Sequence, residues 1–557
     1  MKFAFTTSLR CGALALGLLL VACTTQTEQT SPSANATTQQ PSDRTVVAPV
    51  SPPPIEAAGI PEPEQKAAPA QADVLVQGAP LMEDYAARMP PPAPGSIYVP
   101  DYQLLPENTE KYQSYGDNPV KLTSAEALST ISLDVDTGSY SNVRRFLNQG
   151  QLPPRDAVRV EEMINYFRYS DAQPLAGHPF AVQTEVAAAP WNPDHLLLRV
   201  GVKAVDVQAA AMPPANLVFL VDVSGSMNSP DKLPLVQSSL KMLTAQLRPQ
   251  DRVALVVYAG RTAVELPATA GDQKEKIQAA IARLQAGGST AGESALKLAY
   301  AQARAAYIKD GINRILLATD GDFNVGVSDI KQLKSMIERE RESGISLTTL
   351  GFGQGNYQDA MMQELADVGN GNYSYIDSLS EAHRVLVEEM SSTFNTVAKD
   401  VKIQLEFNPA QIAEWRLIGY EKRVLREEDF KNDKVDAGDV GAGKTVTALY
   451  ELTPVGAATL HGERRYGATA AAPAANGKNA ELGFLRIRYK QPEGSQSTEL
   501  SQAIAKPNAA GELARVAPSN DLRFASAVAA FGQLLRQSPY TGNFSYADVK
   551  KLAAGAG

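Results

Sequence analysis

The sequence predicts an α/β fold: a doubly wound, mostly parallel sheet, flanked by a helical N-terminal extension and by a β-rich C-terminal domain with a terminal helix. Two apolar runs carry this prediction, because residues 217–221 and 315–318 are apolar at every position and each run leads into an aspartate, Asp222 or Asp320. Continuous apolar runs are typical of strands that helices cover on both faces. Segments with helical periodicity alternate with these runs and with further strand-like runs, as a doubly wound sheet requires.

The first 23 residues have the features of an export signal. Lys2 and Arg10 give a basic start, residues 12–21 form an apolar core, and Leu-Val-Ala-Cys closes the segment at Cys23. This order resembles a bacterial lipoprotein signal, in which Cys23 would be lipidated and would become the first residue of the mature chain. An ordinary secretory signal or a short membrane helix is the alternative, although the apolar core is short for a bilayer span. Cys11, the only other cysteine, would leave with the signal, so the mature chain would have no disulfide.

Residues 24–97 are dominated by Pro, Ala, Gln, Ser and Thr, and predict a disordered tether because they hold too few apolar side chains to form a core. The net charge of -9 argues against nucleic acid and against electrostatic docking on anionic lipid. We therefore expect the N-terminal lipid to attach the chain to a membrane of the bacterial cell envelope. Because Thr24 rather than Asp follows Cys23, resemblance to lipoproteins of the enteric type favours the outer membrane over the inner one.

An ordered extension, residues 98–213, precedes the central domain. Its apolar spacing predicts helices at 139–148 and 156–169. Alternating apolar residues predict a hairpin with strands at 180–188 and 196–204.

The central domain, residues 214–396, alternates strands with helices. After the strand that ends at Asp222, the pattern predicts a helix at 233–247, a strand at 253–258, an edge strand at 264–268, a helix at 274–284, the strand that ends at Asp320, a helix capped by Ser328, a strand at 345–352, a helix at 359–367, a strand at 373–376 and a helix from Ser380. Such folds bind ligands outside the carboxyl ends of their strands, where Asp222 and Asp320 are expected to lie.

The C-terminal domain, residues 397–557, has a different pattern. It predicts strands at 401–407, 415–420, 445–452 and 482–489 and a helix at 520–536. A two-stranded hairpin alone is marginally stable in water, and the ends of an α/β domain commonly lie close together. We therefore expect the strands before Val205 and after Asp400 to build one β-sandwich, into which the central domain is inserted.

Side chains that carry oxygen cluster after the first apolar run. Asp222, Ser224 and Ser226 lie two residues apart, and the glycine between the serines lets the backbone turn tightly enough for the oxygens to converge. Oxygen ligands of this kind suit Mg²⁺, Mn²⁺ or Ca²⁺. A plain strand-to-helix turn capped by Asp and Ser is the alternative. However, a later glycine-rich loop presents the hydroxyl of Thr290, and Asp320 ends the second apolar run.

This order of residues resembles the von Willebrand factor type A domain with its metal-ion-dependent adhesion site, over about residues 214–395. The family's Asp-x-Ser-x-Ser, Thr and Asp fall on Asp222, Ser224, Ser226, Thr290 and Asp320. The resemblance implies that the serines and often the threonine touch the metal, and that the aspartates act largely through water. It also implies that an acidic residue of a protein partner fills the open position. The extension resembles one that accompanies a bacterial lipoprotein subfamily of this domain.

We therefore expect a non-enzymatic, membrane-anchored lipoprotein that binds a protein partner through a divalent cation, with Mg²⁺ favoured over Mn²⁺ or Ca²⁺. A site with one carboxylate at each strand end leaves a bound Mg²⁺ positive enough to attract an Asp or Glu of the partner. Two other functions stay open: a metal-assisted hydrolase that uses bound water, and an envelope scaffold whose metal site is vestigial.

Three other patterns give weaker signals. Asp136-Thr137-Gly138-Ser139 matches the catalytic turn of aspartic proteases, but no second such turn supplies a partner carboxylate, so we expect Ser139 to cap a helix. Residues 438–445 fit the phosphate-binding loop pattern, yet a polar run precedes them and a strand-like run follows, so we expect no nucleotide. The four histidines, His178, His195, His383 and His461, lack the spacing of metal ligands.

Overall fold

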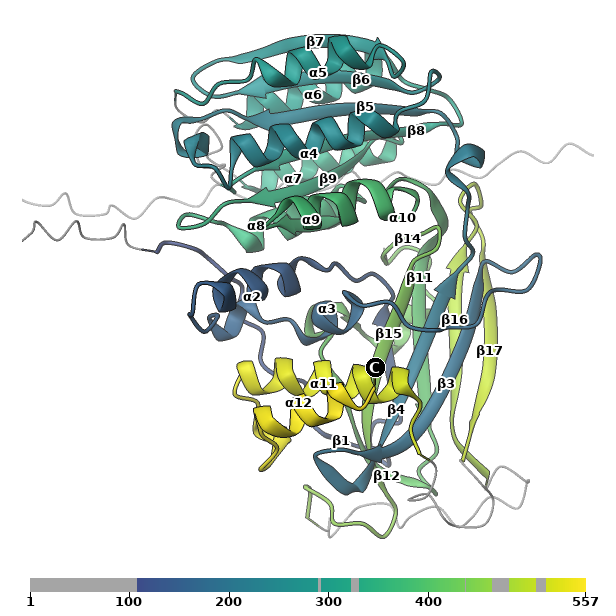
Figure 1. The fold of residues 1–557 in the computed structure, drawn as a ribbon. Helices are drawn as coiled ribbons and strands as arrows, with labels where there is room; N and C mark the ends of the chain where they lie inside the picture. Colours follow the sequence, from purple (N-terminus) through teal and green to yellow (C-terminus); the bar gives the residue numbers. More distant parts are fainter. Residues whose placement is uncertain are drawn as a thin grey trace, which may run out of the picture. The chain divides into compact units, whose positions relative to one another are not determined.

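The structure, a computed structural model, describes residues 108–288, 292–321, 330–435, 437–462, 480–506 and 517–556 (Figure 1). All of them belong to one compact unit, Pro100–Gly557. Cys23, the predicted tether, Thr290 and the predicted helix cap Ser328 lie outside the described residues.

A six-stranded sheet forms the centre of the fold. Its strand order is β10-β9-β8-β5-β6-β7, and only β7 runs antiparallel to its neighbour. The strands are β5 Ala215–Asp222, β6 Arg252–Tyr258, β7 Thr262–Ala270, β8 Ile312–Thr319, β9 Ser346–Phe352 and β10 Tyr373–Ile376. Every residue of β5 and β8 is buried, as their continuous apolar sequences predict. The predicted mostly parallel sheet is confirmed, and the predicted edge strand, β7, runs antiparallel to its neighbour.

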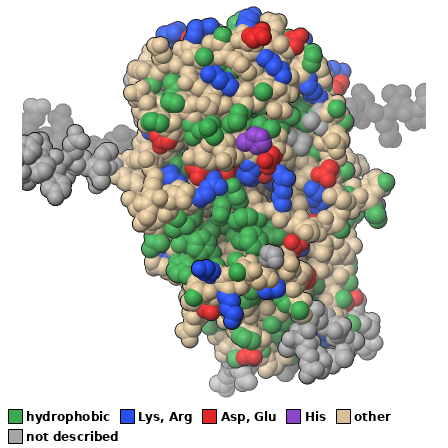
Figure 2. All heavy atoms as spheres, viewed as in Figure 1, with side chains coloured by type: hydrophobic (Ala, Val, Ile, Leu, Met, Phe, Trp, Pro, Cys, Tyr) green, Lys and Arg blue, Asp and Glu red, His purple; other side chains and the backbone are tan. Residues whose placement is uncertain are grey.

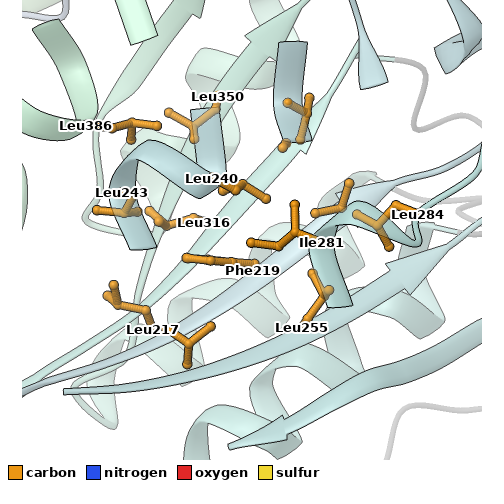
Figure 3. Close-up of a cluster of buried hydrophobic side chains, with 14 of the residues drawn as sticks. Leu217, Phe219, Leu240, Leu243, Leu255, Ile281, Leu284, Leu316, Leu350 and Leu386 are labelled. Atoms are coloured by element: carbon orange, nitrogen blue, oxygen red, sulfur yellow. The ribbon is translucent and has the colours of Figure 1, made fainter. Parts of the chain in front are cut away.

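Helices cover both faces of this sheet and create two cores. Side chains from α4, α5 and α9 pack on one face, and side chains from α6, α7 and α8 pack on the other. Figure 3 shows the first core, where Phe219 of β5 meets side chains such as Leu240 of α4 and Ile281 of α5. The helices are α4 Leu233–Gln246, α5 Lys274–Ala282, α6 Gly292–Ala305, α7 Ile330–Glu342, α8 Asp359–Val368, α9 Leu379–His383 and α10 Met390–Phe394.

A β-sandwich joins the segments on either side of the central domain. Its two sheets have the strand orders β1-β12-β15-β4-β3 and β13-β2-β11-β16-β17. The strands are β1 Lys121–Leu122, β2 Leu128–Ser132, β3 Phe180–Ala189, β4 Asn192–Ala204, β11 Thr396–Phe407, β12 Ile412–Ile418, β13 Val424–Leu425, β15 Thr445–Pro454, β16 Glu481–Lys490 and β17 Ser497–Ala505, with β14 Val440–Gly441 paired to β11.

The predicted pairing between strands on the two sides of the central domain is confirmed. Strand β4 pairs antiparallel with β15, so that Leu196 lies opposite Leu452, and β2 pairs with β11. The inner faces of both sheets contribute to a single core. The chain therefore leaves the sandwich after β4, forms the central domain, and returns at β11 (Figure 1).

The extension differs from its predicted form in two ways. The expected helix at 156–169 is instead a 3₁₀ turn, Arg155–Ala157, followed by the short helix α3, Val160–Asn165. Asn165, the last residue of α3, contacts β15: its side-chain Nδ2 donates to the Thr447 carbonyl at 3.1 Å, and its Oδ1 accepts the Thr447 backbone amide at 2.7 Å. The extension also contains two strands that were not expected, β1 and β2, in addition to the predicted hairpin of β3 and β4.

Three helices, α2 Gly138–Asn148, α11 Asn520–Leu535 and α12 Tyr546–Ala554, complete the fold; the first two were predicted, whereas α12 was not. Residues of α3 and α11 share a core with Leu197 and Leu449 of the sandwich. Figure 2 shows hydrophobic side chains gathered on the face where Figure 1 places α2, α3 and α11. Four partly exposed rings of this region contact one another, mostly edge to face: Tyr140, Tyr166, Phe167 and Phe524. These contacts connect α2 and the residues after α3 to α11, near the C-terminal end of the described chain.

None of the helices in the described part of the chain combines the length and the apolar character that a bilayer span requires.

Candidate metal site at the carboxyl edge of the central sheet

Two buried carboxylates meet at the carboxyl edge of the central sheet. Asp222 ends β5, and Asp320 directly follows β8, which is the parallel neighbour of β5. Thr319, the last residue of β8, donates its hydroxyl to Oδ2 of Asp222 at 2.8 Å. The parallel pairing of two adjacent strands thus brings together residues that are about a hundred positions apart in the sequence, as predicted.

The loop after β5 adds two serine hydroxyls. The backbone amide of Ser224 donates to Oδ1 of Asp222 at 2.9 Å, and the Oγ atoms of Ser224 and Ser226 lie 2.9 Å apart. Backbone hydrogen bonds from Gly225 to Gly288 and from Gly287 to Val223, at 3.0 and 2.7 Å, fix the glycine-rich loop against this turn. The predicted ligands Asp222, Ser224, Ser226 and Asp320 are therefore brought together, and Thr290 follows in the same glycine-rich loop, two residues beyond its described part.

Lys232 forms an ion pair with Asp320. Its Nζ lies 2.9 Å from Asp320 Oδ2 and 3.0 Å from Oδ1 of Asn356, and the Asn356 amide donates to the same Asp320 oxygen at 3.1 Å. Lys232 comes from the segment before α4, and Asn356 from the loop after β9. These two loops thus fix the orientation of the Asp320 carboxylate.

The two carboxylates differ in their pKa. Burial and the charge of Asp320 raise the pKa of Asp222 to about 6, although the hydrogen bond from Ser224 partly opposes this. Burial would also raise the pKa of Asp320, but the ammonium group of Lys232 outweighs it and lowers this pKa. A hydrogen bond from Ser226 acts in the same direction. Asp320 is therefore held as a carboxylate, and a cation bound beside Asp222 would stabilise the ionised form of Asp222 as well.

The donor set fits a small, hard cation. Adjacent ligands of an octahedral Mg²⁺ at about 2.1 Å lie about 3.0 Å apart, which matches the 2.9 Å between the Oγ atoms of Ser224 and Ser226. All the oxygens come from carboxylates and hydroxyls, the groups that Mg²⁺, Mn²⁺ and Ca²⁺ prefer. The described residues contain no group of three or more His, Cys, Asp or Glu placed to hold a metal. A cation here would thus depend on the serines as well as on Asp222 and Asp320.

The sequence interpretation missed Lys232, Thr319 and Asn356. Thr319 precedes Asp320 directly, and its position at a strand end was a usable signal. Lys232 was also detectable, because a positive charge just before a helix is unfavourable next to the positive end of the helix dipole. Such a position suggests that the lysine has another role. The loop after the predicted strand at 345–352 is expected at this edge, but no local pattern in that loop marks Asn356.

The aspartic-protease pattern serves a structural purpose. Oδ1 of Asp136 accepts the amide of Tyr373 at 2.9 Å and so ties the extension to β10. The prediction that Ser139 caps the helix is wrong: α2 begins one residue earlier, and the buried Ser139 hydroxyl donates to the carbonyl of Ala157 at 2.7 Å. It also accepts the amide of Arg159 at 2.9 Å. The Ser139 side chain therefore bonds to the backbone of Ala157 and Arg159 and does not cap α2.

Asp136 should make the stability of the fold depend on pH. Burial and the neighbouring Asp134 raise its pKa from 3.8 to about 7, although Arg423 opposes this. The folded state then holds the proton more tightly than the unfolded chain, so this contribution is present below about pH 4 and is lost as the pH rises through 7. We expect Asp136→Asn to reduce the loss of unfolding free energy between pH 5 and pH 8 by about 2 kcal/mol. Urea unfolding at both pH values measures this, and equal losses in the two proteins would contradict it.

The remaining patterns lie away from the carboxyl edge. In residues 438–445, Val440–Gly441 forms β14 and Thr445 begins β15, so a strand follows the loop where a phosphate site needs a helix. Nζ of Lys444 lies 3.6 Å from Oδ1 of Asp134, whereas the lysine of a phosphate-binding loop reaches the phosphates that the backbone amides bind. Nδ1 of His195, His383 and His461 lies 2.8, 3.2 and 2.8 Å from a carboxylate oxygen of Glu451, Glu388 and Glu414, respectively.

Comparisons with known proteins agree with this architecture. Residues 216–389 match the family described as von Willebrand factor type A domain, residues 106–199 match the one described as von Willebrand factor, and residues 392–557 match "Uncharacterized protein YfbK, C-terminal".

Several relatives share long stretches of the chain. The Uncharacterized protein YfbK of Escherichia coli K12 is 53% identical over 456 residues, which cover 80% of this chain and 77% of that protein. The Uncharacterized protein sll0103 of Synechocystis is 29% identical over 223 residues, with 40% of this chain and 51% of that protein covered. The bovine inter-alpha-trypsin inhibitor heavy chain H4 is 24% identical over 237 residues, with 41% and 24% covered.

Solved structures with a similar fold include the von Willebrand factor type A protein from Catenulispora acidiphila. It is 15% identical, with a TM-score of 0.38, and the match covers 70% of this chain and 98% of that one. Proximal thread matrix protein 1 from the mussel byssus, described with a zinc-occupied MIDAS motif, is 20% identical, with a TM-score of 0.27 and with 34% and 46% covered.

A von Willebrand factor type A domain suggests a protein-interaction or adhesion-type function. The identity with YfbK extends well beyond that domain, into the sandwich on both sides. The chain therefore belongs to the family of Escherichia coli YfbK, and it contains a von Willebrand factor type A domain.

Proposed function

We propose that this protein is a lipid-anchored component of the bacterial cell envelope that binds a protein partner through a divalent cation, most readily Mg²⁺. The observation that carries the proposal is the pair of serine hydroxyls, 2.9 Å apart, beside two buried carboxylates at the edge of the sheet. Asp222, Ser224, Ser226 and Asp320, with Thr290 as a further ligand, would hold the cation. When bound, Mg²⁺ would supply an open coordination position and a positive charge for an acidic side chain of the partner.

The residues around the site support binding rather than catalysis. Asp222 positions the backbone of Ser224, and Asp320 is held by Lys232 and Asn356. None of the described hydrogen bonds joins a histidine to Ser224 or Ser226, and a serine nucleophile needs an adjacent base. We therefore assign the hydroxyls to metal ligation.

Capture of envelope proteins on the immobilised protein tests the proposal. We expect a defined partner to be retained in Mg²⁺ and released by EDTA, with Mg²⁺ binding measured in parallel by calorimetry. Retention that survives EDTA would contradict a metal-dependent contact, and absence of Mg²⁺ binding would favour the scaffold with a vestigial site. Turnover of generic esters or phosphates that depends on Asp222 would favour the hydrolase instead.

The lipid anchor is a second part of the proposal and rests on the sequence around Cys23. Cells that express the chain should incorporate radiolabelled palmitate into it, and Cys23→Ala should abolish the label and release the protein from the membrane fraction. Label that persists in the variant would rule out Cys23 as the anchor. Separation of inner and outer membranes would then identify the target membrane, which we expect to be the outer one.

A further inference from the structure

Lys232 places a permanent positive charge inside the proposed metal site. Its side chain is 8% exposed, and its ammonium group pairs with the fully buried carboxylate of Asp320 at 2.9 Å. Burying an ammonium group is costly unless it is paired and hydrogen-bonded. Asn356 supplies the additional hydrogen bond, at 3.0 Å. The ammonium group of Lys232 therefore lies within the site and is largely shielded from solvent.

The fold holds Lys232 in this position at some cost. It is the N-cap residue of α4, where a cation faces the positive end of the helix dipole and where its side chain makes no capping hydrogen bond. The aliphatic part of the side chain crosses the backbone of Gly353, the residue after β9. A Cβ atom on Gly353 would come within 2.3 Å of Cε of Lys232, and Gly353 has a φ of +75°. Glycine at 353 thus leaves the space that Lys232 fills.

The charge of Lys232 changes the electrostatics of the site in two opposite ways. With Asp222 and Asp320 ionised, the lysine leaves the site with one net negative charge, so a bound divalent cation would make it positive by one. Without the lysine, the same cation would produce a neutral site. A neighbouring ammonium group repels an incoming cation, but it adds to the attraction for an acidic group that binds afterwards.

We propose that Lys232 is a built-in counter-cation that weakens the binding of the divalent metal and strengthens the binding of an acidic partner. This inference rests on the proposed metal site and adds that Lys232 sets the net charge of that site. A lysine with a purely structural role would have a different signature, because its removal would loosen the site and weaken both binding steps together.

Calorimetric titration of the whole protein with MgCl₂ tests the first half. Lys232→Met and Lys232→Gln remove the charge, and the glutamine can still donate to Asp320, whereas Lys232→Arg keeps the charge. We expect both neutral variants to bind Mg²⁺ about tenfold more tightly than the wild type, and the arginine variant to stay within about threefold of it. Unchanged or weaker binding in the neutral variants would overturn the inference. Failure of both neutral variants to unfold cooperatively, with the arginine variant intact, would assign Lys232 a structural role and overturn it as well.

Binding of an acidic probe tests the second half. At saturating Mg²⁺, an acetylated Gly-Glu-Gly amide should bind the wild type about threefold more tightly than it binds Lys232→Gln, as measured by NMR line broadening of the peptide. Equal or tighter binding to the variant would overturn the inference.

The titrations separate this inference from the proposed function. If neither the wild type nor any variant binds Mg²⁺, both fail. If the wild type binds and the neutral variants do not bind more tightly, only the role of Lys232 fails. Binding by the neutral variants alone would support the lysine as a counter-cation and would remove the proposed function.

Discussion

Replacing Arg159 with alanine should lower the free energy of unfolding by about 3–5 kcal/mol. Arg159 is 3% exposed, and its guanidinium lies 2.5 Å from Glu162 and 2.8 Å from Asp359, which are also buried. The truncated side chain would leave two carboxylates without their cation in the interior, where an unpaired charge is strongly unfavourable. Because Arg159 belongs to the extension and Asp359 begins α8 of the central domain, the loss would also measure how strongly these two parts depend on each other.

Arg168→Ala is the matched control for this experiment. Its side chain is 70% exposed and lies 3.7 Å from Glu388, so its removal should change stability by less than about 0.5 kcal/mol. Urea unfolding followed by tryptophan fluorescence measures both variants. A loss below 1 kcal/mol for Arg159→Ala would contradict a stabilising role for the buried network.

The sequence predicted those parts of the fold that short stretches of chain determine by themselves. Strands β5 and β8 contain the continuous apolar runs 217–221 and 315–318 because helices cover both of their faces, and this pattern is visible without any partner. That the strands before Val205 and after Asp400 build one sandwich could be inferred, because an isolated hairpin from 180–204 would be unstable and the ends of an α/β domain commonly lie close together. The sequence did not show that β15 is the partner of β4.

The elements that were missed or misread depend on contacts with distant residues. Strand β1 has two residues and β2 has five, so neither carries a usable period, and both form only because β12 and β11 offer them an edge. The helix expected at 156–169 is only the short helix α3, although apolar residues continue at helical spacing beyond Asn165. Local spacing therefore did not determine where this helix ends.

The candidate site likewise contains residues that the sequence could assign and residues that it could not. Asp222 and Asp320 could be paired from the sequence because parallel strands end at one edge of a sheet. Lys232 and Asn356 could not be assigned to them, because the sequence does not show which side chains of the segments after β5 and β9 reach Asp320. The charge of the site, unlike its ligands, is therefore a property of the tertiary structure.

Replacing Asp222 with asparagine should weaken Mg²⁺ binding by about 100-fold while the protein stays folded. Asparagine keeps an oxygen that can accept the amide of Ser224, and its amide group can donate to Thr319, so both local hydrogen bonds have a replacement. The buried carboxylate, whose pKa is raised to about 6, is lost without removing an ion pair. The variant therefore separates the charge of the site from its geometry.

Calorimetric titration with MgCl₂ should show this loss of affinity for Asp222→Asn, and capture of the partner from envelope extract should fall with it. Asp231→Asn is the matched control, because Asp231 lies in the same loop and accepts the hydroxyl of Ser229 at 2.5 Å rather than a group of the site. The control should bind Mg²⁺ within about twofold of the wild type, since it leaves the ligand set intact. If Asp222→Asn bound Mg²⁺ as tightly as the control, the cation would have to be held elsewhere in the chain, and the serine pair would have no part in it.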